Sequence, residues 1–137
     1  MNFIDKALAN KDTMTADDFL QAMVEIYEEP ECWNLLDNYP QFVRDIIYII
    51  DYDTDLQMEG LGEFFDNFSE TRYKRTHLAL INCGALKEAG ILERAMRIDP
   101  DSEECDDRYE ELEAETALHN DYEGFWELVC QYVEKNK

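Results

Sequence analysis

The chain has 137 residues, of which 33 are Asp or Glu and 12 are Lys or Arg, so its formal net charge at pH 7 is −21. This length is typical of one domain, and 45% of the residues are hydrophobic, which is enough to build a core despite the charge. The excess of carboxylates argues against direct binding to nucleic acid and against a polybasic membrane anchor, because both anionic partners require Lys and Arg.

Targeting and redox signals are sparse. The N-terminus has no basic start followed by an apolar stretch, and no run approaches the ~18 apolar residues of a membrane span, so we expect a cytoplasmic protein. The four cysteine residues are widely spaced and form no C-x-x-C motif: Cys32, Cys83, Cys105 and Cys130. Free thiols in a reducing compartment are the expectation, and two disulfides are the alternative.

The predicted elements in the first part of the chain are helices, because Gly and Pro are rare and no period-2 alternation persists. Thr15 is the expected N-cap of a helix that ends at Pro30. A longer helix begins at Pro40. It carries apolar residues over much of its circumference, from Phe42 to Ile50, which predicts a central position in the fold.

A break is expected at Gly60–Asn67, where two glycines permit an unusual backbone and two phenylalanines follow. Ser69 should open the next helix, which ends at Gly84, a good left-handed cap. Residues 85–96 predict a further helix, and an aromatic amphipathic helix is expected over residues 122–132. The expected fold is therefore a compact all-α bundle of about six to eight helices, forming a single domain over residues 1–137.

The most distinctive feature is an acidic helix expected from about residue 102 to 119, with Asp101 as its N-cap and Glu104 completing a capping box. Carboxylates recur on it so densely that four like-charge pairs fall at i,i+4 spacing, with only Arg108 to offset them. We take these acids as the first candidate surface for a partner, and a group at the end of the central helix as the second. The candidates are Glu103, Glu104, Asp106, Asp107, Glu110, Glu111 and Glu115, followed by Asp51, Asp53 and Asp55.

Motifs for catalysis and metal binding are weak. The two histidine residues, His77 and His119, lie far apart in sequence, and no P-loop, GxGxxG or GxSxG motif occurs. Cys and His do not cluster at the spacing of zinc ligands. Two runs imitate calcium loops, starting at Asp51 and at Asp99, but each lacks the glycine at position 6 that makes the sharp turn. We therefore expect neither enzymatic activity nor a cofactor or metal.

Residues 60–98 resemble a known family. A glycine-glycine-phenylalanine-phenylalanine-asparagine turn is followed by a helix that ends in Gly-Ala, and the aromatic helix from Tyr122 to Val133 also fits. The motif residues are Gly60, Gly62, Phe64, Phe65, Asn67, Gly84 and Ala85. They look architectural, and Leu61 and Glu63 stand where small or amide residues are commoner in the family. The resemblance spans about residues 42–133 and points to the all-helical family, once a domain of unknown function, named after a bacterial DNA-mimic protein.

The resemblance implies an acidic helical protein that occupies the DNA-binding surface of a transcription factor. The net charge independently favours an acidic module that binds a basic protein, as a DNA mimic does. An immunity-type inhibitor of a basic toxin or nuclease is the main alternative, because it has the same electrostatics. A second alternative is that the charge serves solubility alone. Both a monomer and a homodimer are compatible with the sequence.

Overall fold

The computed structural model describes all residues, 1–137, as nine α-helices, three 3₁₀-helices and no strand. This confirms the predicted all-α class, with slightly more helices than the six to eight expected. None of the helices combines the length and apolar character needed to span a bilayer. The α-helices are α1 (Phe3–Ala9), α2 (Ala16–Met23), α3 (Gln41–Met58), α4 (Leu61–Asn67), α5 (Glu70–Asn82), α6 (Leu86–Met96), α7 (Cys105–Ala114), α8 (Ala117–Asn120) and α9 (Tyr122–Asn136). The 3₁₀-helices are η1 (Lys11–Thr13), η2 (Val24–Tyr27) and η3 (Pro30–Asn38).

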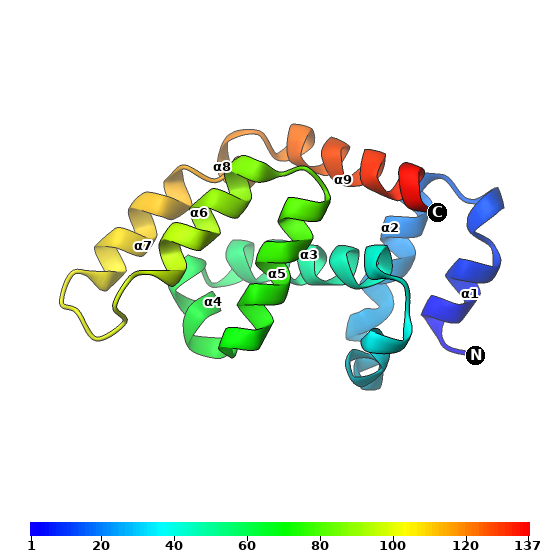
Figure 1. The fold of residues 1–137 in the computed structure, drawn as a ribbon, viewed down its shortest axis with the longest axis horizontal. Helices are drawn as coiled ribbons and strands as arrows, with labels where there is room; N and C mark the ends of the chain where they lie inside the picture. The colour runs from blue at the N-terminus through cyan, green and yellow to red at the C-terminus, as the bar shows by residue number, and fades with distance from the viewer.

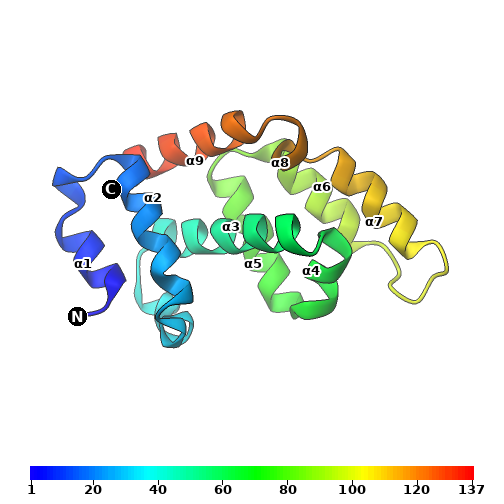
Figure 2. The same cartoon turned by 180° about the vertical axis from the view of Figure 1, so that it is seen from behind.

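Helix α3 is the centre of the fold, as its apolar circumference predicted. Every residue from Phe42 to Asp53 is buried except Arg44. Helix α5 crosses α3 on the side facing the viewer in Figure 1, and α2 crosses it on the opposite side, in front in Figure 2. Helix α9 packs against both α2 and α3 along one edge. Because neighbours cover α3 on several sides, even its polar residues are drawn into the interior.

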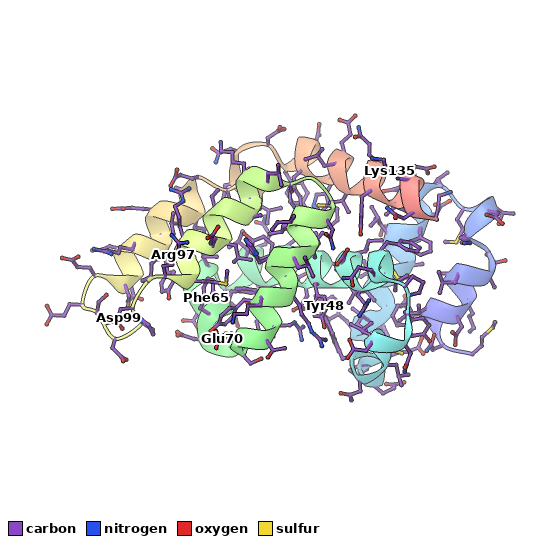
Figure 3. All side chains as sticks on the ribbon, in the orientation of Figure 1. Tyr48, Phe65, Glu70, Arg97, Asp99 and Lys135 are labelled. Atoms are coloured by element: carbon purple, nitrogen blue, oxygen red, sulfur yellow. The ribbon has the colours of Figure 1, made fainter.

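The molecule is elongated (Figure 1). Helices α4, α6 and α7 gather at one end, whereas α1 and both chain termini lie towards the other. The loop between α6 and α7 forms the tip of the first end, and Asp99 lies in it (Figure 3). The acidic segment that follows this loop is therefore far from the termini.

Several predicted helix boundaries are confirmed. The Thr15 hydroxyl accepts a hydrogen bond from the Asp18 N–H at 3.1 Å, and the Ser69 hydroxyl accepts one from the Arg72 N–H at 3.4 Å. Gly84 has φ = +85°, in the left-handed region that favours glycine at the end of a helix. Local cap chemistry therefore positions α2 and α5.

Three predicted boundaries are wrong. The helix expected to end at Pro30 stops at Met23, and the 3₁₀-helix η2 follows it. Most of the expected break at Gly60–Asn67 is helix α4, and only Gly60 at its start has an unusual backbone, with φ = +95°. The expected helix over residues 102–119 is divided into α7 and α8, and Asp101 does not cap it. Instead the Asp99 carboxylate accepts a hydrogen bond from the Asp101 N–H at 2.9 Å, so these residues form a turn before α7.

Candidate protein-binding surface

An acidic cleft of about 560 Å³ lies between α4 and α7. Carboxylates from both sides line it, and no Lys or Arg does. These carboxylates are Glu59, Glu63, Asp66, Asp106, Glu110 and Glu113. Because charges of one sign share the walls of a cleft, their field is concentrated there and attracts cationic groups.

Two glycines allow α4 and α7 to approach each other closely. A Cβ atom on Gly60 would lie 2.9 Å from Glu113 Oε1, and one on Gly62 would lie 3.4 Å from Tyr109 Cδ2. The same Glu113 oxygen accepts a hydrogen bond of 2.6 Å from the Leu61 N–H, which satisfies a free donor in the first turn of α4. The start of α4 therefore lies directly against the Glu113 and Tyr109 side chains of α7.

Aromatic packing fixes α4 between the core and α7. Phe64 is buried and packs edge-on against Tyr52 of α3, with ring centroids 5.4 Å apart. Phe65 stacks on Tyr109 of α7, with centroids 5.7 Å apart and an interplanar angle of 16°. The Asn67 amide donates a hydrogen bond of 2.7 Å to Glu59, which ties the end of α4 back to the end of α3. These motif residues have the architectural role that the resemblance implies.

All seven acids predicted on the segment 103–115 are exposed. Two of them are in ion pairs, Glu104 with Arg108 at 3.4 Å and Glu115 with Arg94 at 3.7 Å. The other five form no ion pair, and two of those line the cleft. We define the acidic face as these five together with two exposed acids of α4: Glu63, Asp66, Glu103, Asp106, Asp107, Glu110 and Glu111.

The model of one protein family, described as DMP19-like protein, matches residues 37–136. The chain belongs to the DMP19-like family. This confirms the resemblance, over a somewhat longer stretch than the 42–133 expected. The DMP19-like region runs from α3 to α9 and includes the entire acidic face, whereas α1 and α2 precede it. No curated protein and no solved structure matches the chain.

The second predicted acidic surface of this DMP19-like chain is wrong for Asp51 and Asp53, which are each only 8% exposed. Asp51 pairs with Arg72 of α5 at 2.8 Å and accepts a hydrogen bond from the Tyr27 hydroxyl. Asp53 accepts a hydrogen bond of 2.8 Å from the Tyr122 hydroxyl of α9. The physical reason is the central position of α3, because helices packed around it cover its acids and supply their partners.

Asp55, the third acid of that group, is half-buried, and its Oδ2 atom has no hydrogen-bond partner. Burial, followed by the nearby Asp51 charge, raises the pKa of Asp55 to about 6. The negative charges of Glu59 and Glu63, which line the cleft, also raise the pKa of Asp55, so the field of the cleft reaches this residue. Asp55 therefore lies beside the acidic face but is not part of its exposed surface.

The cations of the DMP19-like region do not neutralise the acidic face. Six Lys and Arg residues lie between residues 72 and 97, and five of them are in ion pairs. These pairs are Arg72–Asp51, Lys74–Glu70, Arg75–Asp37, Arg94–Glu115 and Arg97–Glu93. Only one of the five, Arg94–Glu115, reaches the acidic segment. The charges of the acidic face are therefore left for solvent or a partner.

Groups with metal-binding or acid–base chemistry are scattered. Glu29, Glu31 and Cys32 place one ligand atom each within 4.8 Å of one another. Burial and the neighbouring carboxylates raise the pKa of the Cys32 thiol, which disfavours the thiolate that a metal requires. The calcium-like run that starts at Asp51 lies largely inside α3, so it is not a loop. His119 contacts Glu113 at 3.3 Å but is exposed.

Four acids that line the cleft are absent from the predicted candidates: Glu59, Glu63, Asp66 and Glu113. Glu113 lies on α7 itself, and the other three fall in or beside the glycine-phenylalanine motif, for which the sequence predicts only an architectural role. The one available signal was Glu63, an acid at a position where the family more often has a small or amide residue.

Proposed function

We propose that this protein is a non-catalytic binding module whose acidic face engages the basic surface of a DNA-binding protein in place of DNA. The observation that carries the proposal is the arrangement of carboxylates from α4 and α7 on both sides of one cleft that contains no cation. Membership of a family named after a DNA-mimic protein supports the same function.

The spacing of the carboxylates suits a partner that normally contacts phosphates. Successive acids on a helix at i,i+3 and i,i+4 have Cβ atoms ~5–6 Å apart, which places Asp106, Glu110 and Glu113 in a row along α7. DNA presents two such rows, with one charge per ~1.7 Å of axis over both strands. Lys and Arg side chains directed at two phosphate strands could bind carboxylates on the two walls of the cleft. Association should be fast and salt-sensitive, because long-range attraction steers the encounter.

Solubility alone is a weaker explanation of this charge. A net charge of magnitude ~2–8 suffices to keep a small domain in solution. Each like-charge i,i+4 pair on α7 costs ~0.2–0.5 kcal/mol, so scattered acids would serve solubility with less loss of stability. The acids cluster around one cleft without countercations, and binding of a basic partner explains this arrangement better than solubility does.

A pull-down with charge-matched variants tests the proposal. The first variant, called the acidic-face variant, neutralises four of the seven acids of the acidic face with Asp106→Asn, Asp107→Asn, Glu110→Gln and Glu111→Gln. The control neutralises four exposed acids outside it, Asp12→Asn, Glu25→Gln, Glu28→Gln and Glu31→Gln. Both variants have the same net charge, so only the location of the charge differs. Each is immobilised, incubated with extract of the native host at low salt and eluted with a salt gradient.

We expect the wild type and the control to retain the same basic protein and the acidic-face variant to lose it. The purified partner should bind DNA, and wild-type protein should displace that DNA in a gel-shift assay. Equal losses in the two variants would mean that only total charge matters, which contradicts the proposal. A captured nuclease or toxin that loses activity in the complex would instead establish the inhibitor alternative.

A further inference from the structure

Helices α2, α3 and α9 meet in another part of the molecule (Figure 2). A second recess lies between them. This groove has a volume of about 610 Å³. Its wall is apolar, with side chains from all three helices and from η2: Leu20, Val24, Ile50, Tyr122, Trp126 and Cys130. No residue of the acidic face lines it, so the groove and the acidic cleft are separate surfaces.

Parts of the groove wall are open to solvent. Val24 is 43% exposed and Tyr122 is 46% exposed, although both are large hydrophobic residues next to the core. Trp126, which also lines the groove, packs edge-on against Tyr122, with ring centroids 6.4 Å apart. Exposed apolar side chains gathered in a concave site are typical of a binding surface.

The rim of the groove is acidic. Asp17 on α2 and Glu123 and Glu127 on α9 are exposed, line the groove and form no ion pair, and no Lys or Arg lines it. An occupant therefore needs an apolar face for the wall and positive charge at its edges. A second copy of this chain is a poor occupant, because each copy carries a net charge of −21.

We propose that this groove binds a basic amphipathic helix of a partner protein. The lining of α2 and η2 extends from Asp17 to Val24, eight residues or about 11 Å, which is two turns of an occupying helix. Helices that bind in such grooves insert apolar side chains at i, i+3, i+4 and i+7, and here Lys or Arg beside that stripe would reach Asp17, Glu123 and Glu127. Helix α2 precedes the family match, so the groove is partly built from a segment outside it. The inference does not depend on the function proposed for the acidic face.

A synthetic peptide provides the probe. An 18-residue, N-acetylated and C-amidated peptide of Leu and Lys, with Leu at helical spacing on one face, is compared with a scrambled peptide of the same composition. The protein has two Trp residues, Trp33 and Trp126, so its ¹⁵N spectrum has two indole signals, and Trp126→Phe assigns them. We expect the amphipathic peptide to shift the Trp126 indole and the Val24 amide while leaving the Trp33 indole in place.

Two variants of equal charge then show whether the peptide binds in the groove, because its affinity for each of them is measured. Val24→Glu places a charge in the groove, and Leu86→Glu places the same charge on α6, where Leu86 is 66% exposed. Both positions are exposed, so both variants should fold, which circular dichroism checks. We expect Val24→Glu to weaken binding of the amphipathic peptide at least tenfold and Leu86→Glu to change it less than twofold. The acidic-face variant should still prefer the amphipathic peptide to the scrambled one. The proposal for the groove and the proposal for the acidic face are therefore tested independently.

Three results would overturn the inference. The two peptides could bind equally well, which would indicate attraction by net charge alone. Val24→Glu and Leu86→Glu could have equal effects, which would place the peptide elsewhere. Sedimentation could show a wild-type dimer that Val24→Glu converts to a monomer, which would assign the groove to a second copy of the chain.

Discussion

The Arg72 guanidinium lies 2.8 Å from the Asp51 carboxylate, and its central carbon lies 3.9 Å from the centroid of the Trp33 ring. The pair joins α5 to α3, and the aromatic ring covers the cation on one side. Tyr27 donates a hydrogen bond to the other carboxylate oxygen at 2.8 Å. An acid that resembles a surface ligand in the sequence is therefore the central member of a structural cluster.

Replacing Arg72 tests this cluster. Arg72→Gln should lower the free energy of unfolding by about 2 kcal/mol, because Asp51 is left partly buried without its cation. The loss should be below the ~3–5 kcal/mol of a fully buried pair, since the two side chains are 22% and 11% exposed. Lys74→Gln, which breaks the exposed pair with Glu70, is the control and should leave stability unchanged within error, because solvent screens exposed ion pairs. Urea unfolding followed by circular dichroism measures both, and equal effects would contradict the role of Asp51.

Two glycine substitutions should have opposite effects. Gly60→Ala should destabilise the fold by about 1–3 kcal/mol, because φ = +95° with ψ = 170° is a backbone conformation that essentially only glycine adopts. Gly90→Ala, within α6, meets no atom within 4 Å and should stabilise the fold by about 0.5–1 kcal/mol. Thermal melts of the two variants check the signs. A stabilising Gly60→Ala would show that the positive φ at Gly60 has no conformational cost.

Asp55 should make stability depend on pH. Its pKa of about 6 in the folded state is above that of an unfolded Asp, so the folded protein binds more protons between about pH 4 and 6. Its contribution to stability is therefore present below pH 4 and is lost as the pH rises through 6. Asp55→Asn removes the charge that burial and Asp51 disfavour, so it should be more stable than wild type at pH 7 and equal to it near pH 4. The gain at pH 7 should be about 1 kcal/mol, less than the full value of the pKa shift, because Asp55 is partly exposed to solvent. Urea titrations at several pH values test this, with Asp12→Asn as an exposed control that should show no such difference.

The acidic face should reduce the stability of the free protein. Glu110→Gln removes the repulsion from Asp106, and Glu111→Gln removes the repulsion from Asp107, each four residues earlier on α7. Each change should raise the free energy of unfolding by ~0.2–0.5 kcal/mol at low salt. The gain should shrink at ~1 M salt, where the Debye length is ~3 Å. Calorimetry at two salt concentrations measures it. A gain that is independent of salt would mean that packing, and not repulsion, is responsible.

The sequence by itself determined the helical class, the central helix and several boundaries, because these depend on local patterns. Hydroxyl caps at Thr15 and Ser69 and the left-handed Gly84 need only their immediate neighbours to act. The exposure of the acids on residues 103–115 was also predictable, since a helix so densely charged cannot be buried. The family followed from motifs within the same chain segment.

Only the tertiary structure decided which acids form a surface. Asp53 and Glu63 are both acids beside apolar residues, yet the Tyr122 hydroxyl covers the first and the second lines an open cleft. Their difference depends on helices far away in sequence, α9 and α7, whose positions follow from packing and not from local patterns. The same holds for the groove between α2 and α9, since neither helix has a recess by itself and the apolar wall exists only where the two converge on α3.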